Sequence, residues 1–210
     1  MLTVGLTGGI ACGKSVVRRL LEGLGAFTMD ADTIAHGLMG AGSEVSYRIG
    51  KCFGEEVLAR DGSVDRSRLG ARVFGDADAR RRLNALVHPL VIEEEKRLIE
   101  DARRRGEIVA VVDAALMIEV GSYSAYDTLV VAFCRREMQI ARLMERNALS
   151  TEEATRRVDA QLPAEEKKRY ADFVIDTSGT LEDTERQVGE VWNRLLELAE
   201  RKKKPEASDQ

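Results

Sequence analysis

The chain has 210 residues, of which 44% are hydrophobic and 32% charged. This composition supplies apolar material for a folded core and excludes wholesale disorder. The 32 basic and 36 acidic residues leave a formal net charge of −4 at pH 7. A chain with so small a charge has no global electrostatic reason to coat nucleic acid or a membrane, so we expect neither as a partner. Any phosphate must be held by a local site.

The three cysteines, Cys12, Cys52 and Cys134, are far apart in the sequence. They form no CxxC pair and no Cys/His cluster, which excludes a zinc template and a disulfide framework. The first residues lack the basic start and apolar run of a signal peptide. The longest apolar stretch, 108–118, is too short to span a bilayer. We therefore expect a cytoplasmic protein.

Short apolar runs predict five strands, at 2–6, 26–29, 108–112, 128–133 and 173–175. These runs are apolar throughout rather than alternating, which indicates strands that are buried on both faces. Such strands are typical of a parallel sheet covered by helices, so the predicted fold class is α/β.

Helical periodicity fills most of the sequence between these strands. A helix is predicted from Ser15, and further helices at 65–74 and 76–87, after which Pro89 starts or kinks a longer helix ending near Arg105. Ser150 to Glu153 has the form of a capping box that opens a helix, and a final helix runs through Val188 and Leu195.

We expect one domain over residues 1–200 and a charged, frayed tail over 201–210. Its core comprises about 1–32, 107–134 and 171–200. Two helical segments interrupt the core. One, about 33–106, is much longer than a sheet crossover needs and predicts a subdomain that faces the substrate. The other covers about 135–170.

The strongest motif runs from Gly8 to Ser15 and matches the pattern of Gly, four residues, Gly, Lys and Ser between a strand and a helix. Gly8 and Gly13 allow the backbone to wrap its amides around a phosphate, and the helix start points its positive dipole end at the same anion. Lys14 can reach the β- and γ-phosphates, and the Ser15 hydroxyl is placed to bind Mg²⁺. The motif predicts an ATP- or GTP-binding protein with these nucleotide contacts: Gly8, Gly9, Ala11, Cys12, Gly13, Lys14, Ser15 and Val16.

Cys12 within this loop has two interpretations. A helix N-terminus lowers the pKa of a thiol, which would favour redox chemistry. A small residue that contributes only its backbone is the simpler interpretation, and we favour it.

Two carboxylates, Asp30 and Asp32, follow the second predicted strand. If the sheet is parallel, the carboxyl end of that strand lies beside the phosphate loop. One carboxylate can then orient or deprotonate an acceptor hydroxyl while the other reaches a metal through water. Helix capping is the alternative, and it suits Asp30 because the residues from Ala31 onward look helical. We favour chemistry for Asp32 and leave Asp30 open.

Gln139, Arg142 and Arg146 share one face of a predicted helix. Arginines in such a position can close over a triphosphate and neutralise charge in the transition state. The segment 135–169, however, holds nine basic and seven acidic residues. Charge counting alone therefore favours a solvated helix face.

Several classes of nucleotide-binding protein share the loop. A guanine-nucleotide switch would need an Asn-Lys-x-Asp motif, which is absent, and an ATPase motor is usually larger. A small-molecule kinase needs the loop, a carboxylate, an acceptor pocket and mobile basic residues, and the sequence offers a candidate for each. A nucleoside or nucleotide kinase would differ in the acceptor pocket, and a non-catalytic nucleotide-binding protein would not need Asp32.

From Val4 to about Val188 the chain resembles the dephospho-CoA kinase family. The resemblance rests on motifs that occur in the family's order: Gly5 to Ile10 with Gly13-Lys14-Ser15, Asp30-Ala31-Asp32, Asp61-Gly62 with Asp65-Arg66 and Leu69, Leu83 to Val91 with His88-Pro89, Gln139 with Arg142-Leu143, Arg146 and Gln161, and Ala171 to Ile175.

This resemblance implies a parallel-sheet P-loop NTPase fold with a helical acceptor-binding insertion at 33–106 and a helical lid at 135–170. It implies ATP and Mg²⁺ as cofactors, and phosphorylation of the ribose 3′-hydroxyl of dephospho-CoA, which gives coenzyme A and ADP in the last step of coenzyme A synthesis. Dephospho-CoA would dock between the sheet edge and the insertion. We expect a monomer or a weak homo-oligomer.

The resemblance also implies individual roles. Asp32 would be the general base, while Lys14 and Arg142 would stabilise the transferring phosphoryl group. Arg142 and Arg146 would contact ATP. Asp30, Asp32 and His88 would contact the acceptor, although a histidine at a helix start, before Pro89, is an equal alternative for His88.

The chain departs from the family pattern at three places. Ala115-Leu116-Met117-Ile118-Glu119 stands where the family usually has Pro-Leu-Leu-Phe-Glu. Ala11-Cys12 replaces Gly-Ser in the loop, and Asp176 replaces an Asn near the adenine. None of these changes removes a catalytic group.

Overall fold

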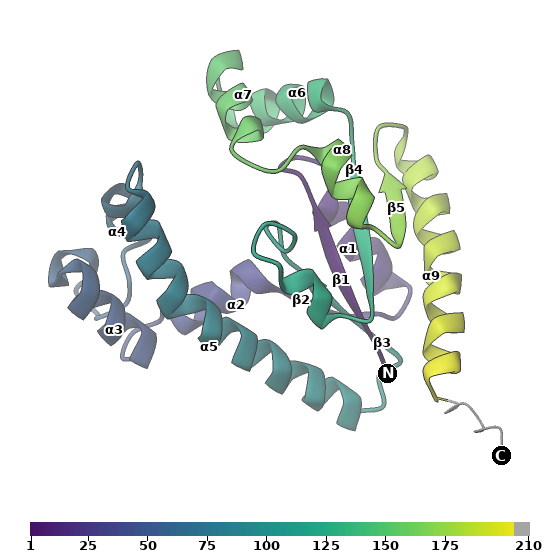
Figure 1. Cartoon of the computed structure of the whole chain (residues 1–210), viewed down its shortest axis with the longest axis horizontal. Coiled ribbons are helices and arrows are strands. Elements are labelled where there is room, and N and C mark those ends of the chain that lie inside the picture. The colour runs from purple at the N-terminus through teal and green to yellow at the C-terminus, as the bar shows by residue number, and fades with distance from the viewer. Residues whose placement is uncertain (204–210) are drawn as a thin grey trace. The chain divides into compact units, whose positions relative to one another are not determined.

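The computed structural model describes residues 1–203, which form two compact units. The first unit comprises residues 1–29 and 101–203, and the second comprises residues 30–100. The phosphate loop, the strands and the 135–170 segment belong to the first unit (Figure 1).

The first unit is built on a five-stranded sheet in the order β2-β3-β1-β4-β5. The strands are β1 (Leu2–Gly8), β2 (Phe27–Asp30), β3 (Val109–Asp113), β4 (Thr128–Phe133) and β5 (Phe173–Asp176). β1 pairs in parallel with both β3 and β4, and β4 pairs in parallel with β5. The predicted α/β class is confirmed, and all five predicted strands form within two residues of their expected bounds.

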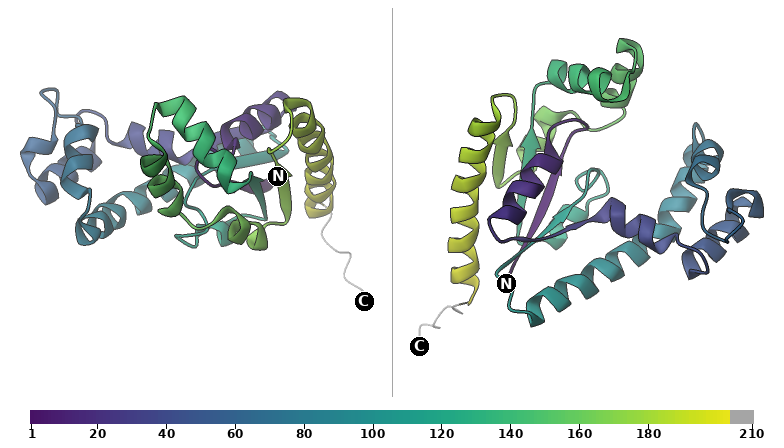
Figure 2. Two further views of the ribbon diagram at one scale, coloured as in Figure 1. Left: turned by 90° about the horizontal axis from the view of Figure 1, so that it is seen from above. Right: turned by 180° about the vertical axis from the view of Figure 1, so that it is seen from behind.

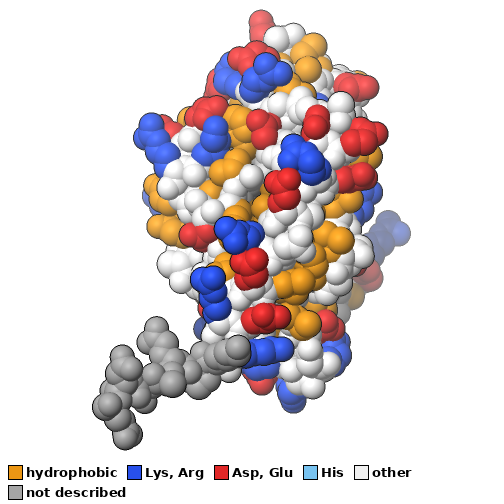
Figure 3. Space-filling model, turned by 90° about the vertical axis from the view of Figure 1, so that its right-hand side faces the viewer, with side chains coloured by type: hydrophobic (Ala, Val, Ile, Leu, Met, Phe, Trp, Pro, Cys, Tyr) orange, Lys and Arg blue, Asp and Glu red, His pale blue; other side chains and the backbone are white. Residues whose placement is uncertain are grey.

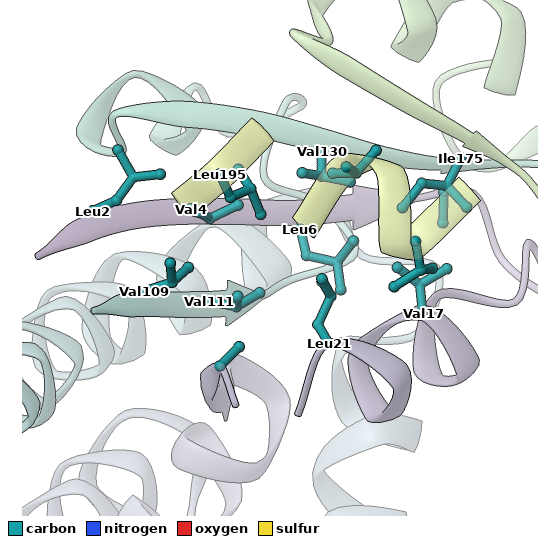
Figure 4. Packing of buried hydrophobic residues seen from close by; sticks show 14 of the residues in the cluster. Leu2, Val4, Leu6, Val17, Leu21, Val109, Val111, Val130, Ile175 and Leu195 are labelled. Atoms are coloured by element: carbon teal, nitrogen blue, oxygen red, sulfur yellow. The ribbon is translucent and has the colours of Figure 1, made fainter. Parts of the chain in front are cut away.

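The core of this unit lies between the sheet and two helices, α1 (Lys14–Gly23) and α9 (Leu181–Lys203), which pack against each other and against β1 (Figure 2, right). Figure 4 shows Leu6, Val17 and Leu21 turned toward the same cluster. Every residue of β3 and β4 is buried, as expected for strands that are covered on both faces. Burial of this apolar surface is the main force that holds the two helices to the sheet.

The segment after β4 forms α6 (Arg136–Asn147), α7 (Thr151–Asp159), α8 (Ala164–Lys167) and the short 3₁₀ helix η3 (Lys168–Tyr170). The predicted capping box is confirmed: the Ser150 hydroxyl accepts from the backbone N–H of Glu153, and the Glu153 carboxylate accepts from that of Ser150. A small cluster centred on buried Leu143, Ala154 and Val158 holds α6 against α7.

The second unit contains α2 (Ala31–Leu38), α3 (Glu44–Phe53), the 3₁₀ helix η1 (Glu55–Val57), α4 (Arg66–Val73) and most of α5 (Ala77–Arg104), which continues into the first unit. Its own core includes Ile49, Phe53, Val57 and Leu69. A third 3₁₀ helix, η2 (Ser122–Ala125), follows β3 in the first unit.

The sequence left open whether Pro89 starts or kinks a helix. Pro89 lies inside α5, so the first alternative, a separate helix that begins there, is wrong. A proline within a helix removes one backbone hydrogen bond and costs about 3 kcal/mol. Apolar side chains on both sides of it, Val87 and Val91, are buried in the same core. Their burial on both sides of Pro89 stabilises the continuous helix and offsets the local cost.

The C-terminal helix also exceeds its prediction, since α9 includes 201–203 of the segment that we expected to fray. The remainder of that segment, 204–210, lies outside the described residues. Across the described chain, no helix carries an apolar stretch that could cross a bilayer. Basic and acidic side chains alternate over the face shown in Figure 3, with no extended area of one sign.

Candidate active site

The phosphate loop leaves β1 at Gly8 and enters α1 at Lys14. A Cβ atom on Gly8 would lie 2.4 Å from the carbonyl oxygen of Ala132, so only glycine allows β1 and β4 to approach this closely here. Gly13 has φ +71°, in the left-handed region. Ala11 also has a positive φ, +60°, which costs a residue with a side chain about 1–2 kcal/mol. The glycine that is usual in the family at this position would avoid that cost.

The backbone N–H and carbonyl oxygen of Ile10, in the loop, are held by two glutamines of the 135–170 segment. Its carbonyl oxygen accepts a hydrogen bond of 2.8 Å from Gln139 Nε2, and its N–H donates one of 2.8 Å to Gln161 Oε1. Gln139 is buried, with 3% of its surface exposed. The loop is therefore preorganised by side chains that come from far along the chain.

Arg142 bridges the loop to the residues after β5. Its guanidinium donates to the carbonyl oxygens of Ala11 at 3.3 Å and Thr177 at 2.7 Å. The expectation of a solvated helix face, taken from charge counting, is wrong for Gln139 and Arg142, because both are used in tertiary hydrogen bonds. It is correct for Arg146, which is exposed.

A pocket of about 560 Å³ lies beside the loop. It is bounded by the loop and start of α1, by α6, and by the segment that leads into α9. Its lining residues are Ala11, Gly13, Ser15, Val16, Arg142, Glu145, Arg146, Thr177, Gly179, Thr180, Leu181 and Thr184. Six of the predicted nucleotide-contacting residues are thus brought together on its wall.

The other predicted loop residues lie elsewhere in the loop. The Cys12 side chain is buried, with 1% exposed, and points toward Cys134. Lys14 makes an ion pair with Asp113. Gly8 and Gly9 lie close to Ala132 and Gln139.

Asp113 is a functional candidate that the sequence analysis missed. It ends β3 opposite Leu6 of β1, and its carboxylate, only 2% exposed, is paired with Lys14 and lies 3.4 Å from Arg18 Nε. A buried carboxylate is tolerated where cations compensate it. In P-loop proteins an acid at this position helps to hold Mg²⁺. An apolar strand that ends in aspartate was the signal available in the sequence.

The residues present fit a magnesium ion bound together with nucleotide. Mg²⁺ prefers oxygen ligands and usually takes one or two from the protein, with phosphates and waters supplying the rest. The Ser15 hydroxyl and the Asp113 carboxylate are ligands of this kind. Within residues 1–203 no group of three or more acidic, histidine or cysteine side chains forms a separate metal site.

The predicted acceptor residues belong to the second unit. Asp30 is the N-cap of α2 and its Oδ1 accepts from the Thr33 N–H at 3.0 Å, so the capping interpretation is confirmed for it. Asp32 lies in the first turn of α2 and is exposed. His88 is half-buried in the interior of α5, which rules out the helix-start interpretation.

A buried ion pair anchors the far end of the 135–170 segment, and sequence reasoning did not find it. Lys167 has no exposed side-chain surface, and its Nζ lies 2.8 Å from Glu119 Oε1 and 2.8 Å from the Ala115 carbonyl oxygen. The same Glu119 oxygen accepts from the Leu162 N–H at 3.2 Å. The 115–119 segment, which departs from the family pattern, is thereby bound to the end of the 135–170 segment.

The family model described as dephospho-CoA kinase matches residues 2–183. The chain belongs to the dephospho-CoA kinase family. It is 44% identical to the dephospho-CoA kinase of Geobacter sulfurreducens over 192 residues, covering 91% of this chain and 98% of that protein. It is 40% identical to that of Syntrophus aciditrophicus over 209 residues, covering 99% and 89%.

Solved structures agree with this assignment. The dephospho-CoA kinase of Campylobacter jejuni superposes with a TM-score of 0.63 at 26% identity, covering 92% of this chain and 96% of that one. A Thermus thermophilus protein, TT1252, gives a TM-score of 0.78 at 31% identity, covering 92% and 97%. The predicted fold, the family and the enzyme class of a phosphotransferase are confirmed.

Proposed function

We propose that this chain transfers the γ-phosphoryl group of ATP to the ribose 3′-hydroxyl of dephospho-CoA, giving coenzyme A and ADP. The observation that carries the proposal is the intact phosphate loop beside a pocket lined by Arg142 and Arg146, in a member of this family. ATP is the proposed phosphoryl donor, and Mg²⁺ is proposed to bind through Ser15 and Asp113, where it neutralises phosphate charge.

The proposed residue roles follow from charge and position. Backbone N–H groups of the loop bind the phosphates, and Lys14 with Arg142 stabilises the charge on the transferring group. Lys14 is paired with Asp113 and exchanges part of that interaction for phosphate oxygens when ATP binds. Since phosphoryl transfer asks little covalent chemistry of the protein, positioning and electrostatics supply most of the catalysis.

We propose that the acceptor is activated from the second unit. Asp32 is the general base that takes the proton of the 3′-hydroxyl. Its exposed position in the first turn of α2 supports this role, because an exposed carboxylate is open to substrate. Asp30 positions Asp32 by capping the same helix, and His88 contributes to acceptor binding.

The remaining proposals concern the location, oligomeric state and partners of the protein. We propose a cytoplasmic protein, monomeric or weakly self-associating, that acts on small molecules and not on nucleic acid. The net charge of −4 supports the exclusion of nucleic acid, and so do the interspersed charges on the one face that Figure 3 shows.

The direct test is ADP release from Mg²⁺·ATP with dephospho-CoA, adenosine, AMP and CMP as acceptors. Turnover with dephospho-CoA alone, and a product phosphorylated at the ribose 3′-hydroxyl, is expected. Turnover with a nucleoside or nucleotide instead would overturn the acceptor assignment while leaving the phosphate loop in place.

Two variants test the roles. Lys14→Ala is expected to lower kcat about 10²–10³-fold, because a charge that stabilises the transition state is lost. Asp32→Asn is expected to bind ATP normally and lower kcat about 10²–10⁴-fold. Asp78→Asn is the matched control, since Asp78 is also an exposed acid in the first turn of a helix of the second unit. Wild-type turnover by Asp32→Asn would refute the base assignment.

A further inference from the structure

The two buried cysteines of the first unit are in contact, although 122 residues separate them in the sequence. Cys134 follows β4 directly, and its Sγ lies 3.4 Å from Sγ of Cys12 in the phosphate loop. Neither thiol takes part in the proposed reaction, and both are in the reduced form. The third cysteine, Cys52, is exposed in the second unit.

We propose that Cys12 and Cys134 form a reversible disulfide in response to peroxide, and that this disulfide disables the phosphate loop. The sulfur atoms need to approach by about 1.4 Å to reach the bond length of about 2.0 Å. The formation of the disulfide is independent of the proposed function, whereas its effect on turnover rests on the proposed ATP site.

The surroundings of the pair assign a different role to each sulfur. The Cys134 S–H donates to Cys12 Sγ, which lowers the pKa of the Cys12 thiol, and the Arg142 guanidinium acts in the same direction. The same hydrogen bond raises the pKa of Cys134. Thiolates and not thiols attack peroxides, so Cys12 is the nucleophile and Cys134 is the resolving partner.

The chemistry balances with one peroxide per disulfide. The Cys12 thiolate attacks one peroxide oxygen, the O–O bond breaks, and the departing hydroxide takes a proton to become water, leaving a sulfenic acid on Cys12. Cys134 sulfur then attacks the sulfenic sulfur, the S–O bond breaks, and the hydroxyl leaves as a second water with the Cys134 proton. Two thiols are oxidised by two electrons and one peroxide is reduced.

A cavity of about 350 Å³ next to Cys134 provides space for a small oxidant. It lies between the end of β4 and helices α6 to α8, and its wall includes Phe133, Cys134 and Gln139. Hydrogen peroxide is small enough to enter such a cavity, which would bring the oxidant to the Cys134 side of the pair.

The effect on the loop follows from how Cys12 is held. Its N–H donates to the Gly9 carbonyl oxygen at 3.0 Å, and its own carbonyl oxygen accepts from Thr177 Oγ1 at 3.1 Å. Ala11, the residue before Cys12, has positive φ although it carries a side chain, a strained conformation that tolerates little adjustment. Drawing Cys12 toward Cys134 displaces the amides that cradle the phosphates, and a displacement of about 1 Å in such a site can cost about 10²-fold in rate.

The test is to treat the reduced protein with hydrogen peroxide and measure ATP-analogue binding and kinase turnover. A parallel sample is alkylated in denaturant, so that the buried thiols are reached, and its intact mass is measured. The wild type is expected to retain one alkylatable thiol, to yield a peptide that links Cys12 to Cys134, and to lose at least about tenfold in ATP affinity or turnover. Dithiothreitol is expected to restore both. Cys52→Ser is expected to behave in the same way, except that no alkylatable thiol remains.

Cys134→Ala is the decisive variant, because it removes the resolving partner and also the S–H donor that lowers the pKa of Cys12, which makes the Cys12 sulfur a poorer nucleophile toward peroxide. It is expected to keep its activity at the peroxide dose that inactivates the wild type, and a thermal melt checks that it is folded. Three alkylatable thiols in the treated wild type would overturn the disulfide. Equal inactivation of Cys134→Ala, or a disulfide that leaves ATP binding and turnover unchanged, would overturn the switch.

Discussion

Replacing Glu119 with glutamine tests how the end of the 135–170 segment is anchored. The change keeps the shape of the side chain but removes the charge that compensates Lys167, whose side chain has no exposed surface. The ammonium would retain the Ala115 carbonyl oxygen, 2.8 Å away, as its principal partner. Breaking a buried ion pair by removing one partner costs about 3–5 kcal/mol, because an uncompensated charge stays buried.

The expected size of the effect lies at the lower end of that range. Glu119 keeps 23% of its side chain exposed, and the new amide oxygen can still accept a hydrogen bond. We therefore expect Glu119→Gln to lower the free energy of unfolding by about 3 kcal/mol. In a protein of this length 1 kcal/mol corresponds to about 2–4 °C, so Tm should fall by about 6–12 °C.

Urea unfolding followed by the fluorescence of Trp192 is the assay, since this residue is the single tryptophan and packs on the core of the first unit. Glu190→Gln is the matched control. It removes the same charge from the pair with Arg186 on α9, where both side chains are more than 60% exposed. Such an exposed pair contributes about 0.5 kcal/mol or less.

The double variant Lys167→Met with Glu119→Gln separates burial of a charge from loss of packing. Since an apolar replacement of a buried pair is often neutral or stabilising, it should recover most of the stability lost in Glu119→Gln. The reasoning is refuted if Glu119→Gln costs no more than Glu190→Gln. It is equally refuted if the double variant is no more stable than Glu119→Gln alone.

Two further predictions concern the nucleotide pocket and acid stability. Arg142→Ala should lower kcat/KM for ATP about 10–100-fold, because charge-assisted hydrogen bonds of the kind Arg142 makes to Thr177 contribute about 1.5–3 kcal/mol. Arg142→Lys should not restore kcat/KM, because lysine lacks the planar set of donors of a guanidinium. Steady-state kinetics that show full activity for Arg142→Lys would contradict this reasoning. Burial opposes ionisation of Asp127, but hydrogen bonds from Lys202 and Thr3 outweigh it and lower the pKa of this carboxyl. The stability it contributes is therefore present above about pH 4 and lost as the pH falls through the lowered pKa. Asp127→Asn should reduce by about 0.5–1 kcal/mol the stability that is lost between neutral and acid pH. Thermal melts from pH 7 to pH 3 check this, and a variant whose Tm falls with pH as steeply as that of the wild type would contradict the prediction.

Local sequence patterns determined most of the secondary structure and the centre of the site. The fixed spacing of Gly8, Gly13 and Lys14 predicts a phosphate loop because each position has its own local backbone or charge requirement. The Ser150 capping box forms as predicted, and Asp30, for which the sequence left capping and chemistry open, caps α2. Local patterns suffice here because a cap involves only residues two or three apart. Uninterrupted apolar runs likewise predicted strands that are buried on both faces, because that pattern is contained within each segment.

The tertiary structure decided the contacts between residues that are distant in sequence. Charge counting cannot show that Gln139 is buried against Ile10, because burial depends on what the helix packs against. Propensity cannot show that α5 passes through Pro89, because the core of the second unit stabilises the continuous helix. Local sequence determines the backbone conformation at a cap or a tight loop, whereas tertiary packing determines it wherever side chains are buried.

The same division applies to the groups that carry charge and redox chemistry. The sequence by itself determined that Lys14 would be a cation in the phosphate loop, but only the fold shows that Asp113, 99 residues away, holds it. The sequence likewise shows three cysteines that are far apart, and only the fold shows that two of them, Cys12 and Cys134, are in contact. Such pairs arise because parallel strands β1, β3 and β4 end at one edge of the sheet, and no pattern within a single segment contains that information.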